Sequence, residues 1–342
     1  MTLERKDIKS MTKEEIALEL AEIGQPKFRA KQIYEWLSKG VDSFEEMTNL
    51  SKDLRNALSE KYIVTSAKIA RKLVSQIDGT VKYLFSLYDG EKIESVVMSY
   101  HHGYTICIST QVGCRMGCVF CATGMNGLKR NLFPGEMLSQ ITSAEKDLNI
   151  RISNVVLMGM GEPLDNYENT LKFLQLVNDD EGKNIGARHI SLSTCGLVDK
   201  MYDLSNEKLQ ITLSVSLHAP NDMLRSEMMP INNKWNIEKL LTACKDYTES
   251  TKRRISFEYT VVDGVNDSEE CAKELAKRLK GMLCHVNLIP LNTVSGKEYK
   301  PSQNSKKFCE LLNNMGINAT IRRTLGSDIN ASCGQLAGER NS

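Results

Sequence analysis

Three cysteines lie close together in one short segment of this chain. Cys114, Cys118 and Cys121 are separated by three and two residues in GCRMGCVFCATG, which begins two residues after the strand-like run YTICIST. This spacing lets all three sulfurs face one centre the size of an iron–sulfur cube, and thiolate is the usual protein ligand of such clusters. Three cysteines leave one iron of a four-iron cluster open to another ligand, which suits chemistry better than simple electron transfer.

Two other roles exist for such a segment. Its cysteines could pack in a hydrophobic core or bind a structural zinc ion. Structural zinc takes four nitrogen or sulfur ligands, and Cys107 and His102 are separated from the segment by residues expected to form a strand. Gly113, Gly117 and Gly124 favour a loop wrapped closely round a bound group, because glycine allows backbone approaches that other residues resist. We therefore expect an iron–sulfur cluster.

The spacing CxxxCxxC followed by a small residue resembles the signature of radical S-adenosylmethionine (SAM) enzymes. The resemblance implies a 4Fe-4S cluster held by Cys114, Cys118 and Cys121, with SAM bound to the open iron through its amino and carboxylate groups. It also implies the partial six-stranded (β/α) barrel of that superfamily.

The composition of the whole chain is that of an ordinary globular protein. Its 342 residues are 41% hydrophobic and 25% charged, which is enough for one large domain or two. The start MTLERKDIKSMTKEE has no apolar region of a signal peptide, and no run reaches the roughly 18 apolar residues of a membrane helix. We therefore expect a cytoplasmic protein with no membrane partner, whose ten cysteines serve metal binding or catalysis rather than static disulfides.

Residues 1–62 predict an N-terminal helical domain, because their apolar residues recur near the helical period. Thr12 and Glu15 have the spacing of a capping box at the start of its first helix. The basic stretch PKFRAKQIYEWLSKG could contact RNA, and a solvated face of a small helical domain is an equally good interpretation. Residues 63–103 alternate apolar and polar side chains, which predicts a short antiparallel β extension.

Residues 104–323 predict an α/β fold in which strands and helices alternate. Strand-like runs such as NVVLMGM, HISLSTC, ITLSVSLHA, RISFEYTVV, CHVNLIP and INATIRR are each preceded by a segment with helical period. A repeat of parallel strands and helices over roughly 230 residues is slightly too short for a complete eight-fold barrel. This length agrees with a partial radical SAM barrel. Residues 324–342 would form a C-terminal segment.

Polar residues follow the predicted strands, at the end of a barrel where ligands gather. In GMGEPLDNY, glycines could let the backbone approach a ligand, and Glu162 could accept hydrogen bonds from a cationic amine. Without its context this phrase would indicate only a capped turn, and a histidine at a strand end is more often structural than functional. By resemblance to the superfamily, the residues that contact SAM are Gly161, Glu162, Ser193, Ser216, Leu217, His218 and Asn292.

The chain resembles one family closely from about residue 10 to residue 338. Its phrases GCRMGCVFCATG, MGMGEPLDNY, STCGLV, SLHAPND, EYTVVDGVNDS, VNLIPLN and SDINASCGQLAG are similar to those of RlmN, the dual-specificity methyltransferases of adenine C2 in 23S rRNA and tRNA. The related Cfr enzymes, which methylate adenine C8 in 23S rRNA, are the alternative. Pro163 and Cys195 favour the C2 enzymes. A non-catalytic iron–sulfur redox protein is a more distant alternative.

The resemblance also implies a mechanism that uses further cysteines and two SAM molecules per turnover. The first SAM methylates a C-terminal cysteine, and reductive cleavage of the second gives a 5′-deoxyadenosyl radical that removes hydrogen from this S-methyl group. The carbon radical then adds to C2, which is too poor in electrons to attack the methyl group of SAM directly. By motif match the carrier is Cys333, its transient disulfide partner is Cys107, and the acceptor of the C2 proton is Glu94.

Each of these three residues also has an ordinary interpretation. Cys333 could be a free thiol in a mobile tail, and Glu94 could be a solvent-exposed carboxylate on a strand. Five other cysteines lie in or beside apolar segments and are expected to pack: Cys195, Cys244, Cys271, Cys284 and Cys309.

The partners implied by the resemblance are 23S rRNA, tRNA and an external electron donor such as flavodoxin, and we expect a monomer. The net charge of +1 does not itself indicate a nucleic-acid partner. Local basic clusters could bind phosphate, or each could be a solvated face or the partner of a carboxylate. They are Lys129–Arg130, Arg188–His189, Lys252–Arg253–Arg254 and Arg322–Arg323.

Overall fold

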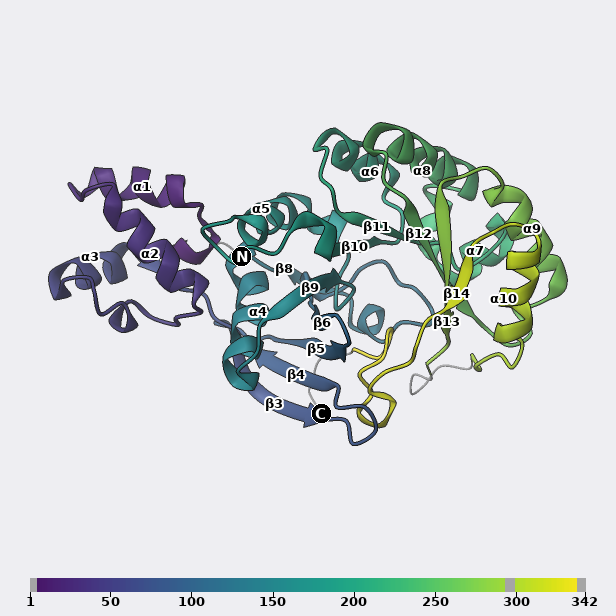
Figure 1. Cartoon of the computed structure of the whole chain (residues 1–342), viewed down its shortest axis with the longest axis horizontal. Helices are drawn as coiled ribbons and strands as arrows, with labels where there is room; N and C mark the ends of the chain where they lie inside the picture. The colour runs from purple at the N-terminus through teal and green to yellow at the C-terminus, as the bar shows by residue number, and fades with distance from the viewer. Residues whose placement is uncertain (1–4, 293–298, 337–342) are drawn as a thin grey trace.

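The computed structural model describes residues 5–292 and 299–336 (Figure 1). The outermost parts of the predicted first and last segments, residues 1–4 and 337–342, lie outside the described residues.

Three helices form the N-terminal helical module, which Figure 1 shows beside the sheet rather than over it. The predicted capping box is confirmed: the Thr12 hydroxyl accepts from the Glu15 backbone N–H, and the Glu15 carboxylate accepts from the Thr12 N–H at 2.7 Å. A short parallel pair of strands ties the two ends of the module together. The elements are β1 (Lys6–Asp7), α1 (Lys13–Glu22), α2 (Phe28–Ser38), α3 (Lys52–Lys61) and β2 (Tyr62–Ile63).

A ten-stranded sheet organises the rest of the chain, in the order β14-β13-β12-β11-β10-β9-β6-β5-β4-β3. Its last four strands pair antiparallel, so the predicted β extension continues the same sheet as the barrel. The antiparallel part comprises β3 (Lys68–Val74), β4 (Val81–Ser86), β5 (Lys92–Tyr100) and β6 (Gly103–Cys107).

From β6 to β14 neighbouring strands are parallel, and β14 and β3 are the two edges of the described sheet. This confirms the predicted α/β fold with an open, partial barrel, to which the three-residue β14 adds a last parallel strand. The parallel strands after β6 are β9 (Ile152–Leu157), β10 (Ile190–Thr194), β11 (Thr212–Ser216), β12 (Ile255–Val261), β13 (Cys284–Pro290) and β14 (Ala319–Ile321).

Amphipathic helices connect these strands, and Figure 1 shows them along the outside of the curved sheet. Several begin at side-chain caps that the sequence supplies: Asn236 caps α8 and Ser268 caps α9. The helices are α4 (Pro134–Leu148), α5 (Tyr167–Asn178), α6 (Val198–Asn206), α7 (Asp222–Met228), α8 (Ile237–Thr251), α9 (Glu269–Leu279) and α10 (Ser305–Asn314). Helix α7 is only seven residues long and was not predicted from the sequence.

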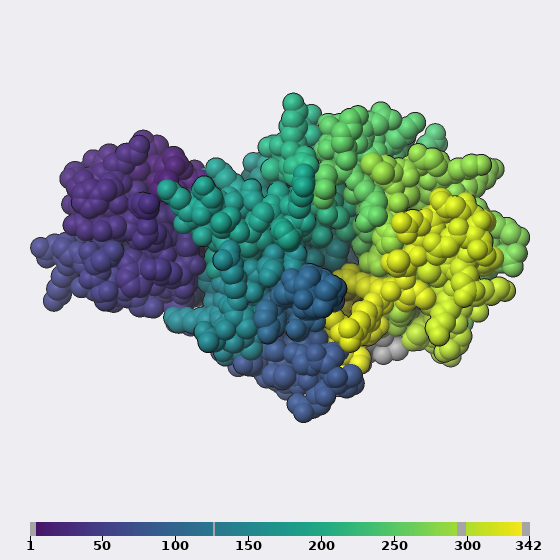
Figure 2. Space-filling model, in the orientation of Figure 1, coloured from purple at the N-terminus to yellow at the C-terminus, as the bar shows by residue number. Residues whose placement is uncertain are grey.

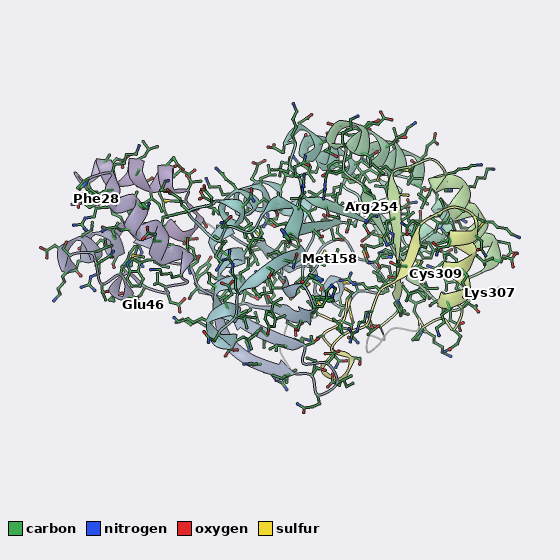
Figure 3. The ribbon with its side chains drawn as sticks, in the orientation of Figure 1. Phe28, Glu46, Met158, Arg254, Lys307 and Cys309 are labelled. Atoms are coloured by element: carbon green, nitrogen blue, oxygen red, sulfur yellow. The ribbon has the colours of Figure 1, made fainter. Side chains whose placement is uncertain are left out.

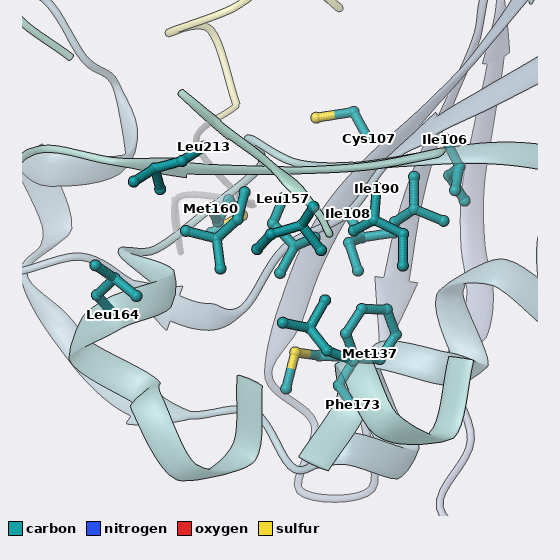
Figure 4. Packing of buried hydrophobic residues seen from close by; sticks show 14 of the residues in the cluster. Ile106, Cys107, Ile108, Met137, Leu157, Met160, Leu164, Phe173, Ile190 and Leu213 are labelled. Carbon is teal, nitrogen blue, oxygen red and sulfur yellow. The ribbon is translucent and has the colours of Figure 1, made fainter. Parts of the chain in front are cut away.

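The alternation of side chains along β6 divides two environments. Figure 4 shows Ile106 and Ile108 on the side of Met137 and Phe173, which belong to α4 and α5, whereas the sulfur of Cys107 points away from them. All of these apolar side chains are fully buried. Because successive residues of a strand face opposite sides of the sheet, β6 helps to build the core with Ile106 and presents Cys107 to the concave side.

The C-terminal segment lies against the β extension, where Figure 2 shows it in yellow beside the blue strands. The Lys82 ammonium donates to the Asn330 carbonyl at 2.9 Å, and the Gly326 N–H donates to the Asp78 carboxylate at 2.9 Å. Farther along, Leu336 is buried and its carbonyl accepts from the Thr123 hydroxyl. Residues up to Leu336 are thus docked on the sheet and on the cysteine loop.

Candidate active site

A small hairpin holds the cysteine loop. Strands β7 (Gln111–Gly113) and β8 (Leu128–Asn131) pair on either side of it, and the Cys114 N–H donates to the Gly127 carbonyl at 2.9 Å. Gly113 has a φ of +76°, and a Cβ there would lie 1.9 Å from that carbonyl oxygen. Only glycine fits this position, so its local role is to close the hairpin.

The three cysteines of the loop line one cavity of about 910 Å³, which we call the cluster cavity. Cys114 is buried, Cys118 and Cys121 are partly exposed, and all three are free thiols. Burial raises the pKa of Cys114 to about 12 and also raises the pKa of Cys118. These pKa values describe the thiols without a metal, and a bound metal deprotonates its thiol ligands outright.

The described residues contain no group of three or more His, Cys, Asp or Glu side chains that could hold one metal ion. A four-iron cluster does not need such a group, because each cysteine binds a different iron. The donor set of three thiols around one cavity therefore fits a 4Fe-4S cluster and does not favour a zinc ion.

Strand ends complete the cluster cavity. Six residues at or after the ends of four strands line it. Gly161 and Glu162 follow β9, and Ser193 is on β10. Ser216 ends β11, His218 follows β11, and Asn292 follows β13. Leu217, also predicted to contact SAM, is fully buried outside this lining, and its N–H and carbonyl pair with Glu258 and Arg225.

Glu162 is buried at the edge of the cluster cavity. Its carboxylate oxygens accept from the backbone N–H groups of Cys195 at 2.7 Å and Leu164 at 3.0 Å. Burial nevertheless raises the pKa of this carboxyl, against those hydrogen bonds. The side chains of Thr194 and Cys195 also hydrogen-bond to this carboxyl, and its contact with a cationic amine stays a prediction.

The glycine before Glu162 also has a role within the chain, beside the contact with SAM predicted for it. Gly161 has a φ of +104°, and a Cβ there would lie 2.6 Å from the Cβ of Gln111. The close approach is therefore to β7 of the same chain. The Glu162 N–H donates to the Gln111 side chain at 2.8 Å, which fixes the carboxylate against the cysteine hairpin.

His218 is buried in the wall of the cluster cavity with a φ of +56°. Its Nδ1 accepts from the Thr260 N–H at 2.9 Å, and its ring meets Phe120 edge-on at 4.7 Å. Burial, with the nearby Arg225 cation, lowers the pKa of His218 to about 3. The imidazole is therefore neutral near pH 7, and its proton resides on Nε2, which is a hydrogen-bond donor.

A second cavity of about 550 Å³ adjoins the first and contains the other two predicted cysteines. We call it the thiol cavity. Cys107 and Cys333 both line it, and Cys333 also lines the cluster cavity. The Asn292 side chain donates to the Cys333 carbonyl at 3.1 Å, so Cys333 does not lie in an unanchored tail.

Glu94 is also buried, which excludes the solvent-exposed carboxylate that the sequence left open. Its carboxylate forms an ion pair of 2.8 Å with Lys82, the residue that holds Asn330. On β5, Val96 pairs with Cys107 and lines the thiol cavity. Glu94 is two residues away on the same face of β5, directed toward the same side of the sheet.

The structure also changes how two basic residues are interpreted. Arg130 is nearly buried and forms a bidentate pair with Glu136 at 2.8 and 2.9 Å. It also donates one hydrogen bond to Asp89 at 2.6 Å, so it is a partner of carboxylates. Arg322 lines both cavities instead of an outer face. Sequence reasoning missed Arg322, Met158 and Glu258 as cavity residues, because only the parallel strand order brings them together.

Cys195, predicted to pack, is buried as expected and yet lines the cluster cavity. Figure 3 labels Met158 near the centre of the molecule, where it lines both cavities. Among the helices of residues 5–292 and 299–336, none is long and apolar enough to cross a membrane.

Two family models match the chain: the radical SAM superfamily over residues 108–279, and the ribosomal RNA large subunit methyltransferase N-terminal domain over residues 6–64. A "Probable dual-specificity RNA methyltransferase RlmN" of Alkaliphilus oremlandii is 54% identical to this chain, and the alignment covers 98% of each of the two proteins. The corresponding protein of Clostridium novyi is 52% identical over 97% of each chain.

A crystal structure of a radical SAM methyltransferase from Sphaerobacter thermophilus is 44% identical, with a TM-score of 0.94 over 98% of this chain and 100% of that one. Radical SAM enzymes use a 4Fe-4S cluster and SAM, which are therefore the cofactors here, and a methyltransferase of this kind uses two SAM molecules per turnover. The chain belongs to the RlmN family of radical SAM enzymes and is a SAM-dependent RNA methyltransferase.

Proposed function

We propose that this enzyme methylates C2 of one adenosine in the peptidyl transferase centre of 23S rRNA and of an adenosine next to the anticodon in tRNA. The family supports a dual specificity, because its members carry that description in their names. The observation that carries the proposal is that Cys333 lines both the cluster cavity and the thiol cavity, with Cys107 in the latter.

In this proposal the three loop cysteines hold the cluster. The residues that bind SAM in the cluster cavity are Gly161, Glu162, Ser193, Ser216, His218 and Asn292. Glu162 would accept from the amino group, and the neutral His218 would donate from Nε2. When bound, the cluster and SAM supply the electron and the 5′-deoxyadenosyl radical that activate a methyl group. Cys333 carries that methyl group from one cavity to the other.

Cys107 would release the product from Cys333. Its thiolate attacks Sγ of Cys333, forming the disulfide as the bond from that sulfur to the methylene carbon breaks. The electron pair of the broken bond goes to this carbon, which takes up a proton and becomes the methyl group on C2. The attack itself balances as an electron pair, and the unpaired electron that radical addition leaves on the adenine ring would pass to a one-electron acceptor. A thiol or dithiol reductant can regenerate both cysteines afterwards.

Glu94 would accept the proton from C2 before the disulfide forms. It is buried on the face of β5 that carries Val96 into the thiol cavity. Its pairing with Lys82 holds the carboxylate in one orientation and links it to the segment that carries Cys333.

The remaining partners are also part of the proposal. Residues 1–62 would contact RNA, which the family match of this segment supports. An external donor such as flavodoxin would supply electrons to a monomeric enzyme, in the cytoplasm where ribosomal and transfer RNA are found. The boundaries 63–103, 104–323 and 324–342 stay predictions for the β extension, barrel and carrier segment.

Mass spectrometry of nucleosides tests the proposal. RNA that lacks the modification is incubated with anaerobically reconstituted protein, SAM and a reductant. We expect 2-methyladenosine from 23S rRNA fragments and from tRNA, and none from Cys118→Ala or Cys333→Ala. An 8-methyladenosine product would instead assign the Cfr reaction, and product from rRNA alone would remove the tRNA specificity.

A further inference from the structure

Arg322 occupies the junction between the two cavities, directly after β14. It lines the cluster cavity and the thiol cavity, as Cys333 does. Its N–H donates to the Leu288 carbonyl of β13 at 2.8 Å, so the backbone position is fixed by the sheet. About a quarter of its side chain is exposed, because the guanidinium lies in cavity walls and not on an outer surface.

The guanidinium has weak partners for a group with five N–H donors. Within the described chain its hydrogen-bond acceptor is the thioether sulfur of Met158 at 3.4 Å, a weak acceptor. Glu258 is 3.8 Å away and already accepts from Asn287 at 2.8 Å. A partly buried cation with unfilled donors is suited to an anion that appears during the reaction.

In the thiol cavity, the thiols of Cys107 and Cys333 can become anions beside it. The pKa of Cys107 is raised to about 12, mainly by burial and also by the charge of Cys333, while Arg322 opposes both effects. The Cys333 thiolate is in turn the main reason why the pKa of Arg322 is raised. The charged and titratable groups nearest Cys107 are Tyr100 on β5, Arg322 and Arg323 after β14, and Cys333. Glu258 lies beyond Arg322, and Glu94 lies farther along β5, paired with Lys82 of β4.

We infer that Arg322 is the positioning residue that holds the thiolate of Cys107 toward Sγ of Cys333 during product release. The inference rests on the proposed role of Cys107. The attacking thiolate forms the disulfide, the leaving carbon takes the electron pair of the broken bond and a proton, and Arg322 neutralises the charge before attack. Glu258, itself held by Asn287, keeps the guanidinium at the junction.

The attack can be measured without RNA or methyl transfer. In cluster-loaded protein under anaerobic conditions, Cys333 is converted to its mixed disulfide with pyridine-2-thiol, and peptide mass spectrometry verifies the site. Attack by Cys107 on Sγ of Cys333 releases pyridine-2-thione, which absorbs light. Its release rate across a pH series reports the thiolate of Cys107, and Cys107→Ala defines the background.

We expect Arg322→Met to slow the release about tenfold near neutral pH and to move the pH profile upward by about one unit. Arg322→Lys should restore most of the rate because it restores the charge. Arg254→Met is the control: this arginine is exposed and lines a third cavity, which Arg322 and Glu258 also line and which contains neither Cys107 nor Cys333.

An unchanged release rate and pH profile in Arg322→Met would overturn the inference. So would a variant that loses affinity for SAM, measured by titration calorimetry, while it releases the thione normally, because Arg322 would then serve cofactor binding. If Arg322→Met does not retain its cluster, Arg322→Lys and Arg322→Gln provide the same comparison of charge. Methylation of RNA by the wild type is unaffected by any of these results, so the two proposals fail separately.

Discussion

The cluster cavity and the thiol cavity are built in different ways. In the cluster cavity, a short loop supplies three cysteines and the ends of neighbouring parallel strands supply the polar groups. The thiol cavity is assembled from β5 and β6, the residue after β9, the end of β13, the residues after β13 and β14, and the docked C-terminal segment. Cys333, Arg322, Met158, Ile289 and Asn292 line both.

The difference separates two tasks. Groups of the cluster cavity are held by hydrogen bonds from the backbone, such as those from the Glu162 N–H to Gln111 and from the Thr260 N–H to His218. The thiol cavity instead brings two cysteines together from opposite ends of the barrel sequence, beside a weakly partnered arginine. The first is suited to bind cofactors in one geometry, and the second to make and break a covalent bond.

The largest expected effect is that of removing Cys107, which tests whether the two cavities have separate tasks. Cys107 lines only the thiol cavity, so Cys107→Ala should keep its cluster and still cleave SAM, while methylated RNA is lost by at least about a hundredfold. The RNA should remain attached to Cys333, detected as a covalent complex by denaturing electrophoresis. Normal release of 2-methyladenosine would contradict the role of Cys107, and Cys244→Ala, which alters a buried thiol of α8, is the control.

Crowding at Gly161 tests how rigidly the cluster cavity is built. Gly161→Ala should lower the free energy of unfolding by about 2–3 kcal/mol, because the methyl group meets Gln111 and the positive φ is strained. Gly264→Ala is the matched control, since its φ is also positive at +67° and no atom lies within 4 Å of its Cβ, so about 1 kcal/mol is expected. Denaturant titration of both variants measures the difference, and equal losses would show that the contact with Gln111 is unimportant.

The pH dependence of stability tests His218 in the same cavity. Its folded pKa of about 3 lies below the ordinary value of 6.5, so the unfolded chain binds the proton more tightly. The contribution of His218 to the free energy of unfolding is fully present above pH 6.5 and falls as the pH decreases toward 3. About 2 kcal/mol of it is lost by about pH 5.

His218→Asn isolates this contribution, because asparagine tolerates positive φ and can accept from Thr260. Denaturant titrations of both proteins between pH 7.5 and pH 5 should give a smaller loss for the variant. The same loss in both would assign the acid sensitivity to other groups.

Local sequence signals predicted much of this molecule. The spacing of the loop cysteines, the Thr12 capping box and the alternation of strands and helices each depend on residues close in the chain, and the fold agrees with them. The family resemblance supplied Cys107 and Cys333, which the fold places in one cavity.

The features that the sequence did not predict depend on contacts with residues distant in the chain. Arg130 and Arg322 both belong to basic pairs, yet Arg130 meets Asp89 and Glu136, and Arg322 lines the cavities. The burial of Glu94 likewise depends on the strands on either side of β5 and on the C-terminal segment, through Lys82. Alternation along one strand shows which residues share a face and not whether that face is covered.

The most direct test of the central claim follows one methyl group through Cys333. Protein is first incubated with SAM that carries an isotopically labelled methyl group, freed of SAM, and then given RNA, a reductant and unlabelled SAM. We predict label on Cys333 before the chase, by peptide mass spectrometry, and the same label in the first 2-methyladenosine formed. First-turnover product that carries the unlabelled methyl group, with the label still on Cys333, would contradict the account.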